Sequence, residues 1–537
     1  MRIVALGSAV VEERVFGIRA EWVLMYSIRT GTVRMGQRPL AFPGRWPESR
    51  RVGAEGAGTA DRDGAGFDGG LRVVFLAALA AGAVARLVLA FQRPLWADEV
   101  FTLTLAHRTL TGLLAALRLD SGPPLHYLAA KLVLLPFGGP GPSDVAVRLL
   151  SVAASLLHAP LLFRIGRRCG APRAGLAAAA LFLVFPLAVV SGAEGRGYAL
   201  ASLLALAAFE RLLALERAPR PRTAALAGLL GGAAVLTHYL ALLPVAGMLG
   251  VALVRARPRR AAALATVLAA ALAASWLPVA LRQPRASMAW AEAQPLGERT
   301  LQFAANLGLG LPADAGPARF LGPLALVLLT AALLGGRGGA RVPAAAPLLA
   351  GLTLLVPLLL FSGSALLPDR TALVFLPFVS LVLASARNLV PLAAGPAAAV
   401  VLAASLPVWL RPTPAAQLAA TLEPRVRAGA RVVASELWGP ELDYRLARKG
   451  LAGRVTLFPS DVARHPGWYE ESGIPEARLE AEAGAVVRAA AGGTFFVFSP
   501  PTRAGRALGT ALDGKGGLLV AAAGPFEVWI VAARGAG

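Results

Sequence analysis

The chain reads LRVVFLAALAAGAVARLVLAF at residues 71–91 and, shortly after, WADEVFTLTLAHRTLTGLLAALRLDSGPPLHY at residues 96–127. The first stretch is long enough to cross a bilayer core as a helix, which takes about 20 apolar residues. The second holds two adjacent carboxylates, Asp98 and Glu99, followed by a short amphipathic segment and a Pro-Pro turn. Acids at the mouth of a membrane helix cost solvation energy, so the pair indicates a function. The alternative is a solvated loop that is merely acidic.

Composition indicates a membrane protein. Of 537 residues, 56% are hydrophobic and 16% are charged, and the mean hydropathy is +0.62. Soluble domains are about 45–50% apolar and about 25% charged. The net charge of +22 does not indicate nucleic-acid binding, because the arginines cluster in short loops between apolar runs. The one cysteine, Cys169, excludes an intramolecular disulfide and a cysteine-based metal site.

Hydropathy predicts eleven membrane spans, several of them shorter than the about 20 residues that a bilayer core needs. The predicted spans are 71–91, 146–165, 174–191, 197–215, 224–237, 239–254, 261–280, 319–335, 343–362, 371–386 and 390–409. The apolar run 124–137, about 14 residues, is ambiguous and is more typical of a re-entrant or interfacial helix.

Loop charges fix the orientation of these spans. Cytoplasmic loops carry an excess of Lys and Arg. If 124–137 lies at the outer surface, the basic loops all fall on the inner side, and the C-terminus lies outside. These basic loops are 164–173, 217–222, 255–260 and the pair Arg337 and Arg341. The polar segments 96–127, 191–198, 237–239, 282–319 and 362–371 then converge on the outer face.

Three regions are expected along the chain. Residues 1–70 are expected to form a disordered tail, or to be translated only because the start codon is assigned too far upstream. We assign them no function. Residues 71–409 form the membrane domain, whose outer loop 92–145 carries the two acids. Residues 410–537 read as a small soluble α/β domain outside the membrane, with strands near 432–435, 455–458, 494–499 and 526–531 and helices near 441–449 and 476–489. We expect it to have a structural or acceptor-binding role, because it has no glycine-rich phosphate loop.

Several outer residues are suited to chemistry. Asp98 can act as a general base toward an acceptor hydroxyl if it reaches that oxygen at about 3 Å. Arg196, in the segment Glu194–Tyr198, offers a planar fork that binds phosphate; the alternative is an ion pair between Arg196 and Glu194. His238 is either a ligand contact or a packed hydrogen-bonding group.

Four further residues are candidates for binding a substrate or for shaping the site. Arg370 either binds a substrate phosphate or extends to lipid headgroups, and Arg86, inside the first span, has the same two options. Asp120 precedes the Pro-Pro turn and is a candidate to orient the outer helix. Tyr127 lies on that helix and is a candidate substrate contact.

Together these motifs resemble a known family. The ordered set is W-x-D-E-x-x-T at 96–102, P-P-L-x-Y at 123–127, E-x-R-x-Y at 194–198 and the pair Asp369-Arg370. It is similar to the GT-C superfamily of membrane glycosyltransferases, in particular the glycosyltransferase family 39 group of protein O-mannosyltransferases and aminoarabinose transferases. The resemblance covers about residues 71–409.

The resemblance implies a mainly α-helical polytopic membrane protein with the GT-C fold and outer juxtamembrane helices. It implies transfer of a sugar from a polyprenyl-phosphate donor to a lipid, glycan or protein acceptor, at the non-cytoplasmic face of the cell membrane. It makes Asp98 the base and assigns Arg196 and Arg370 to the carrier phosphate. From the residues themselves we also expect Glu99 to be catalytic beside Asp98. The expected substrate site further includes Glu194, Tyr198, His238, Asp120 and Tyr127. Aminoarabinose transferases have a lysine where this chain has Gly122. The resemblance therefore does not identify aminoarabinose as the transferred sugar, and one phosphate contact of those enzymes has no counterpart at this position.

Two other classes of membrane protein differ from this sequence in features that can be checked. A transporter or flippase of lipid-linked sugars would show internal repeats and broken spans near the midplane, and no repeat is visible. A polysaccharide polymerase or ligase would carry its catalytic residues in a large late loop, whereas the acids lie early here. The sequence does not identify a cofactor. Asp98, Glu99, Asp120 and Glu194 could hold a divalent cation, although their spacing does not demand one.

Overall fold

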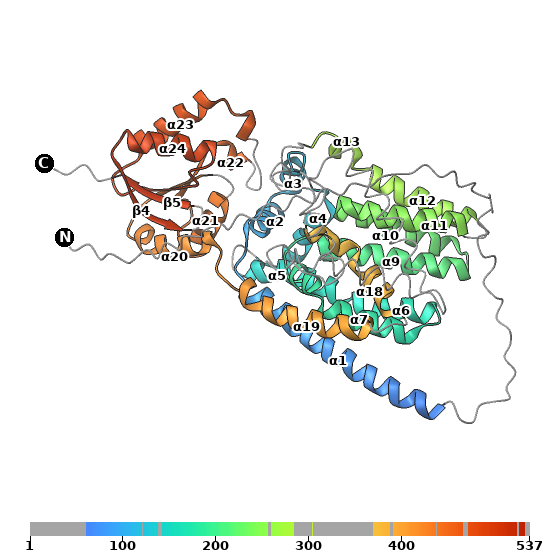
Figure 1. The fold of residues 1–537 in the computed structure, drawn as a ribbon. Coiled ribbons are helices and arrows are strands. Elements are labelled where there is room, and N and C mark those ends of the chain that lie inside the picture. The colour runs from blue at the N-terminus through green and yellow to red at the C-terminus, as the bar shows by residue number, and fades with distance from the viewer. Residues whose placement is uncertain are drawn as a thin grey trace, which may run out of the picture. The chain divides into compact units, whose positions relative to one another are not determined.

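The computed structural model describes residues 61–120, 122–137, 142–255, 259–283, 303, 369–386, 390–435, 438–464, 471–523 and 526–531. Most described residues are helical, and one five-stranded sheet lies near the C-terminus. Figure 1 shows the arrangement of these elements.

Helix α1 (Asp61–Gln92) contains the first predicted span. It begins within the expected tail of residues 1–70, and its part with the length and hydropathy of a span is Gly69–Gln92. Val73, Val74 and Leu76 are exposed large apolar side chains on this helix. Such a surface is costly in water and is suited to lipid.

Three short helices follow in the outer loop: α2 (Ala97–His107), α3 (Leu110–Leu117) and α4 (Leu125–Leu134). Thr109 caps α3 by accepting a hydrogen bond from the Gly112 backbone N–H at 3.1 Å. Helix α4 has ten residues, about 15 Å at 1.5 Å per residue, while a bilayer core is about 30 Å thick. This length agrees with the prediction that 124–137 does not span.

The next apolar runs form α5 (Pro142–Leu156) with α6 (His158–Arg168), then α7 (Pro172–Val184) with α8 (Pro186–Gly192). Helices α7 and α8 meet at 63°. The bend occurs at Phe185-Pro186, because proline lacks an N–H and forces the preceding residue out of helical geometry; Phe185 is extended, at φ −62° and ψ 124°.

The side chain of Arg86 from α1 reaches this break. It donates to the carbonyls of Leu183 at 2.8 Å and Ala188 at 3.2 Å and to Ser155 Oγ at 2.9 Å, and it is fully buried. A broken helix leaves carbonyls before the break without their usual partners, and the bond to Leu183 satisfies one of them. Arg86 therefore stabilises the bend and does not extend to headgroups.

Four helices pack as neighbours in the next part of the chain: α9 (Tyr198–Arg217), α10 (Pro221–Thr237), α11 (Leu242–Arg255) and α12 (Arg259–Ala274). The single turn η1 (Tyr239–Ala241) lies between α10 and α11, and the short helix α13 (Leu277–Ala280) follows α12. Close approach of α10 to α12 requires small residues: a Cβ on Gly228 would lie 2.4 Å from the Ala265 carbonyl oxygen.

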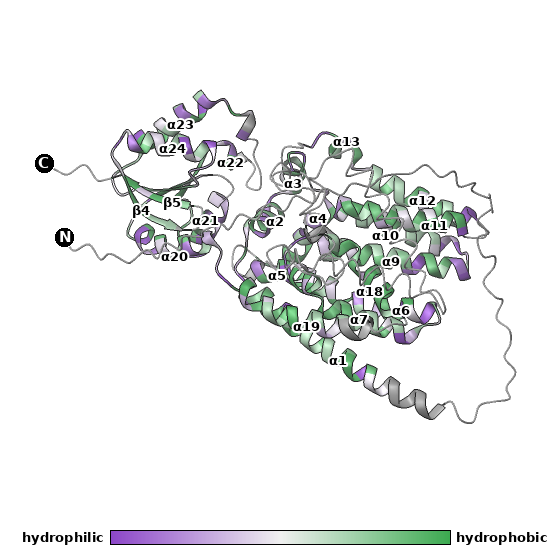
Figure 2. Ribbon diagram, viewed as in Figure 1, coloured by the Kyte–Doolittle hydropathy of each residue, from purple (hydrophilic) through white to green (hydrophobic). Residues whose placement is uncertain are grey.

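The membrane domain closes with η5 (Asp369–Val374), α18 (Leu376–Ala384) and α19 (Val390–Trp409). Figure 2 shows hydrophobic residues along most of α18 and α19. In the described part of the chain, four helices have the length and composition of a membrane span, or five if α7 and α8 count as one. The predicted spans 319–335 and 343–362 lie outside the described residues, so the count of eleven stays a prediction.

The C-terminal region is a three-layer α/β unit. Its strands are β1 (Val432–Ser435), β2 (Val455–Phe458), β3 (Phe495–Phe498), β4 (Gly517–Ala523) and β5 (Phe526–Val531), in the order β2-β1-β3-β5-β4. Strand β1 runs parallel to β2 and β3, and β5 runs antiparallel to β3 and β4. Four strands lie where the sequence predicted them; β4 was not predicted.

Helices cover both faces of this sheet (Figure 1). On one face α23 (Glu476–Ala489) and α24 (Arg503–Asp513) pack over Phe496 and Phe498, and on the other α20 (Pro414–Arg427) and α21 (Trp438–Ala447) pack over Phe495 and Val497. The alternation follows from the two-residue period of a strand. Helix α21 also contacts α2, and Arg448, just beyond it, pairs with Asp144 at 2.8 Å.

Candidate active site

The two adjacent acids begin helix α2. Residue Trp96 has extended backbone angles and precedes the first turn, which contains Asp98 and Glu99. The Glu99 carboxylate accepts a hydrogen bond from the Trp96 backbone N–H at 3.3 Å, as in a capping box. Acids in this turn also interact favourably with the positive end of the helix dipole. The sequence therefore starts a helix here and sends the two side chains in different directions, about 100° apart around its axis.

Glu99 is fully buried, and both of its carboxylate oxygens accept hydrogen bonds. Arg148 of α5 donates from Nε to Oε1 at 2.7 Å and from Nη2 to Oε2 at 2.5 Å. The Gly195 backbone N–H donates to Oε1 at 2.8 Å. Burial by itself would raise the pKa of Glu99, but the charge and hydrogen bonds of Arg148 outweigh it and hold the pKa below its ordinary value. Glu99 is thus an ionised anchor that joins three segments.

Asp98 lies at the surface of the same turn, with 41% of its side chain exposed. Its Oδ2 lies 3.7 Å from Nη2 of Arg196. Arg196 also points Nη1 at the Asp98 carbonyl oxygen at 3.4 Å and at the Tyr127 hydroxyl at 3.2 Å. A solvent-accessible carboxylate beside a fixed guanidinium is the central feature of the site.

Asp120 and Tyr127 extend this group. The Tyr127 hydroxyl donates to Asp120 Oδ2 at 3.3 Å while accepting from Arg196. Burial raises the pKa of Tyr127, so the phenol keeps its proton. A Cβ on Gly122 would lie 3.0 Å from Asp120 Oδ2 and 3.3 Å from the Tyr127 hydroxyl, so a larger residue at 122 would crowd both.

Two histidines border the site as neutral groups. His126 Nε2 lies 3.2 Å from the Gly195 carbonyl oxygen, and burial together with the charge of Arg196 lowers its pKa to about 3. The ring of His238 lies 5.1 Å from that of Tyr198, and the same two causes lower its pKa to about 4. His238 Nδ1 accepts the Leu240 backbone N–H at 3.3 Å, which is a structural role.

Glu194 does not form the side-chain ion pair with Arg196 that the sequence left open. It is 1% exposed and pairs with Arg93 at 2.7 Å, while Arg196 pairs with Asp98. Arg93 follows α1, so this pair ties the end of the first span to the loop before α9. Arg370 lies in η5, and its side chain falls outside the described part of the structure.

Sequence reasoning missed two of the arginines that organise the site, Arg93 and Arg148. Arg148 lies inside the predicted span 146–165, and that position was the available signal, since an arginine in an apolar run usually has a buried partner. Among the described residues, no group of three or more His, Cys, Asp or Glu side chains lies close enough to hold a metal ion.

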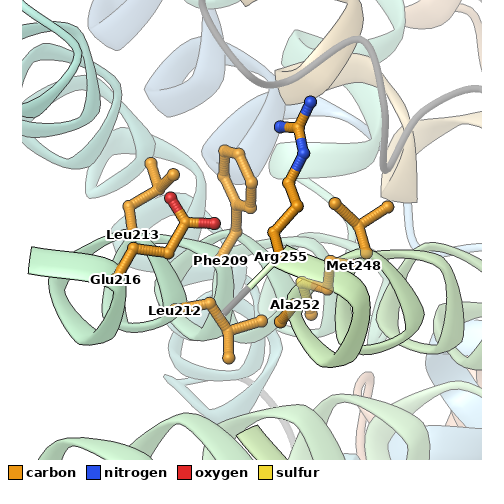
Figure 3. A pocket seen from close by; sticks show the side chains of 8 residues that line it. Phe209, Leu212, Leu213, Glu216, Met248, Ala252 and Arg255 are labelled. Atoms are coloured by element: carbon orange, nitrogen blue, oxygen red, sulfur yellow. The ribbon is translucent and has the colours of Figure 1, made fainter. Parts of the chain in front are cut away.

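A separate cavity lies between α9 and α11 (Figure 3). It is mostly apolar, with Glu216 and Arg255 among its lining residues. Helix α9 starts beside the site at Tyr198 and has 20 residues, about 30 Å at 1.5 Å per residue. Glu216 is in its last turn, so the cavity lies near the other end of α9 and is not part of the site.

Residues 121–281 match the model of the family described as dolichyl-phosphate-mannose-protein mannosyltransferase. This match confirms the resemblance to membrane glycosyltransferases, and it covers the motifs at 123–127 and 194–198 but not those at 96–102 and 369–370. No curated protein matches the chain significantly by sequence.

The chain also aligns with solved structures at low identity and with TM-scores below 0.5. ArnT from Cupriavidus metallidurans bound to undecaprenyl phosphate aligns with a TM-score of 0.48 and 15% identity, over 87% of this chain and 99% of that one. The same protein in the apo state gives a TM-score of 0.47 and 15% identity, over 88% and 99%. The archaeal oligosaccharyltransferase AglB from Archaeoglobus fulgidus, in complex with an inhibitory peptide and a dolichol-phosphate, gives 0.43 and 12%, over 85% and 74%.

Proposed function

We propose that this protein is a membrane glycosyltransferase that moves a sugar from a polyprenyl-phosphate donor to an acceptor hydroxyl. The observation that carries the proposal is the exposed Asp98 carboxylate beside the Arg196 guanidinium, on a turn immobilised through Glu99. The matched family is named for a dolichyl-phosphate sugar donor, which supports a lipid-linked substrate.

In the proposed reaction Asp98 accepts the proton of the acceptor hydroxyl as its oxygen attacks the anomeric carbon. The bond from that carbon to the phosphate oxygen breaks, and the carrier leaves as a polyprenyl phosphate. Charge grows on the phosphate as it leaves, and a fixed guanidinium stabilises it in the transition state. Arg196 supplies that cation, and Arg370 is a proposed second one. Direct displacement with one base inverts the anomeric configuration.

Glu99 serves the same reaction as a positioning residue. Its burial and its bonds to Arg148 and Gly195 keep it from an acceptor, but they fix the turn that presents Asp98 and the loop that presents Arg196. Glu194, paired with Arg93, holds the same loop from the other side. Asp120 and Tyr127 orient the Arg196 guanidinium, and Tyr198 and His238 form the adjoining wall.

The proposed location is the outer face of the cell membrane. The isoprenoid tail of the donor must stay in lipid while its headgroup meets a polar acceptor, and a site at the end of the spans meets both needs. The basic inner loops support this orientation. The C-terminal α/β unit would lie on the same side, where it is available to an incoming lipid, glycan or protein acceptor.

Mass spectrometry of lipid-linked sugars in a deletion strain tests the proposal. Loss of the enzyme is expected to cause one polyprenyl-phosphate sugar to accumulate. Wild-type protein restores the normal profile, and Asp98→Asn does not. An unchanged lipid profile in the deletion strain contradicts the proposed function.

A further inference from the structure

Gln283 is a side chain to which neither the sequence motifs nor the proposed reaction assigns a role. It follows α13, and its half-buried amide uses all of its polar groups. Nε2 donates to the carbonyl oxygens of Leu117 at 2.8 Å and Gly122 at 3.0 Å, and Oε1 accepts from the Tyr239 hydroxyl at 2.7 Å. Two carbonyl acceptors on one side fix the orientation of the amide, because only the NH₂ group can face them.

The two carbonyls bracket one turn of the outer loop. Leu117 ends α3, and Gly122 precedes the Pro-Pro sequence before α4. The described backbone bonds in this turn include Leu119 N–H to the Ala116 carbonyl at 2.9 Å and Asp120 N–H to the Leu117 carbonyl at 3.4 Å, while Pro123 and Pro124, which follow it, have no N–H to donate. Gln283 supplies two bonds from a segment more than 160 positions away in the chain. The turn carries Asp120, which is 9% exposed.

From this turn a continuous series of contacts reaches the proposed base. Asp120 Oδ2 accepts from the Tyr127 hydroxyl at 3.3 Å, and that hydroxyl accepts from Arg196 Nη1 at 3.2 Å. Arg196 Nη2 lies 3.7 Å from Asp98 Oδ2. The direction of donation is consistent throughout, because a phenol can donate once while accepting from another group. A shift of the turn would therefore displace Asp120, the acceptor that orients the Tyr127 hydroxyl toward Arg196.

We propose that Gln283 is a positioning residue that fixes the Leu117–Gly122 turn, so that Asp120 and Tyr127 keep the Arg196 guanidinium beside Asp98. Glutamine suits the role because it combines a double donor for two carbonyls with an acceptor for a tyrosine. Glutamate would lose both donors and place a carboxylate against two carbonyl oxygens. Leucine would fill the space and make none of the bonds.

The first test is hydrogen exchange on the purified full-length protein in lipid nanodiscs. Gln283→Leu and Gln283→Glu are expected to raise amide exchange in residues 117–127 about tenfold, since each variant loses two hydrogen bonds to the turn. Tyr239→Phe keeps both bonds and should leave that segment near wild type. Gln417→Leu, a change at an exposed glutamine on α20, is the matched control and should have no effect. Unchanged exchange in both Gln283 variants overturns the proposal, as does an equal effect of Tyr239→Phe.

The second test is kinetic and is the only part that rests on the proposed function. With a polyprenyl-phosphate sugar as donor, the two Gln283 variants should raise the donor KM at least severalfold, while their melting temperatures stay close to wild type. Raised exchange with an unchanged donor KM and kcat would make the contact purely structural and overturn the positioning role. If the wild type transfers no sugar, the proposed function fails, and the exchange measurement still decides whether Gln283 holds the turn.

Discussion

Asp98 and Glu99 are neighbours in the chain with opposite surroundings. Asp98 is 41% exposed, while Glu99 is fully buried and bonded to Arg148 and the Gly195 N–H. A base must reach an incoming hydroxyl, and only the exposed carboxylate has that access. Different consequences are therefore expected when each acid is neutralised.

Asp98→Asn tests the proposed role of Asp98 as the base directly. The amide keeps the size of the side chain but cannot accept the proton, and loss of a general base typically costs about 10²–10⁴ in rate. We expect kcat to fall by that factor while donor binding stays close to wild type. Purified protein, a polyprenyl-phosphate sugar and a panel of acceptors provide the measurement. Asp513→Asn, at an exposed site on α24, is the matched control, and wild-type turnover by Asp98→Asn would exclude this mechanism.

Arg196 is expected to contribute to donor binding as well as to the rate. Arg196→Ala removes the guanidinium beside Asp98, so affinity for a polyprenyl phosphate should fall by about tenfold or more, as for loss of a charge-assisted hydrogen bond. Arg196→Lys should recover only part of it, because lysine supplies charge without the planar fork. Binding is measured by titration of the purified protein. Arg506→Ala on the C-terminal unit is the control, and unchanged affinity in Arg196→Ala would disprove the phosphate role.

At the scale of elements, Arg148 joins three helices. From α5 it donates to the Ala90 carbonyl at 3.1 Å and the Arg93 carbonyl at 2.5 Å, at and just beyond the end of α1, and to Glu99 at the start of α2. The last carbonyls of a helix lack internal partners, and a cation there also interacts favourably with the dipole. One side chain thus caps the first span and fixes the turn that follows.

Arg148→Met is expected to destabilise the protein more than Glu99→Gln. The first change leaves a buried carboxylate and several carbonyls without their donor, which costs about 3–5 kcal/mol for a broken buried pair. The second also breaks the ion pair, but it keeps the carbonyl contacts that surround the Arg148 charge and leaves an amide oxygen for the Gly195 N–H, so we expect a smaller cost. Chemical or thermal unfolding in detergent measures both. Equal destabilisation by the two variants would contradict the capping role.

The same pair has a pH dependence with a defined sign. The pKa of Glu99 is lowered in the folded state, so its contribution to stability is complete above the ordinary value of 4.5 and is lost as the pH falls toward the lowered value. Wild type should therefore lose stability through this window more steeply than Glu99→Gln. Parallel slopes for the two proteins would show that Glu99 is not the titrating group.

At the scale of the whole molecule, the orientation of the protein in the membrane determines which donors and acceptors can reach the site. Cysteine labelling of intact cells tests it after Cys169→Ser removes the native thiol. Cysteines placed at Leu119 and Asp513 should react from outside, and cysteines at Arg167 and Arg217 only after permeabilisation, because the basic loops are predicted to lie inside. All four positions are exposed in the structure. Labelling of position 167 from outside would reverse the assignment.

Much of the fold could be predicted because its signals are local. Hydropathy located the helices around 71–91 and 197–215, the shortness of 124–137 matches the ten-residue α4, and β-rich runs located β1, β2, β3 and β5. Strand β4 was missed because its glycine and alanine content is untypical of a strand. The bend at Phe185-Pro186 was not predicted, because the apolar run 174–191 was assigned as one continuous span. The signal was present, since a residue before proline disfavours helical angles.

The sequence alone determined that this chain has membrane-spanning hydropathy, a C-terminal α/β unit and two acids at the end of the first span, because composition and periodicity are properties of neighbouring residues. Tertiary structure decided which acid is accessible and which arginine serves which partner. Glu99 meets Arg148 at a separation of 49 positions, and Arg93 meets Glu194 at 101. Buried charges must be paired, and many arginines were available to pair with them; only the packing of the helices selected the partners.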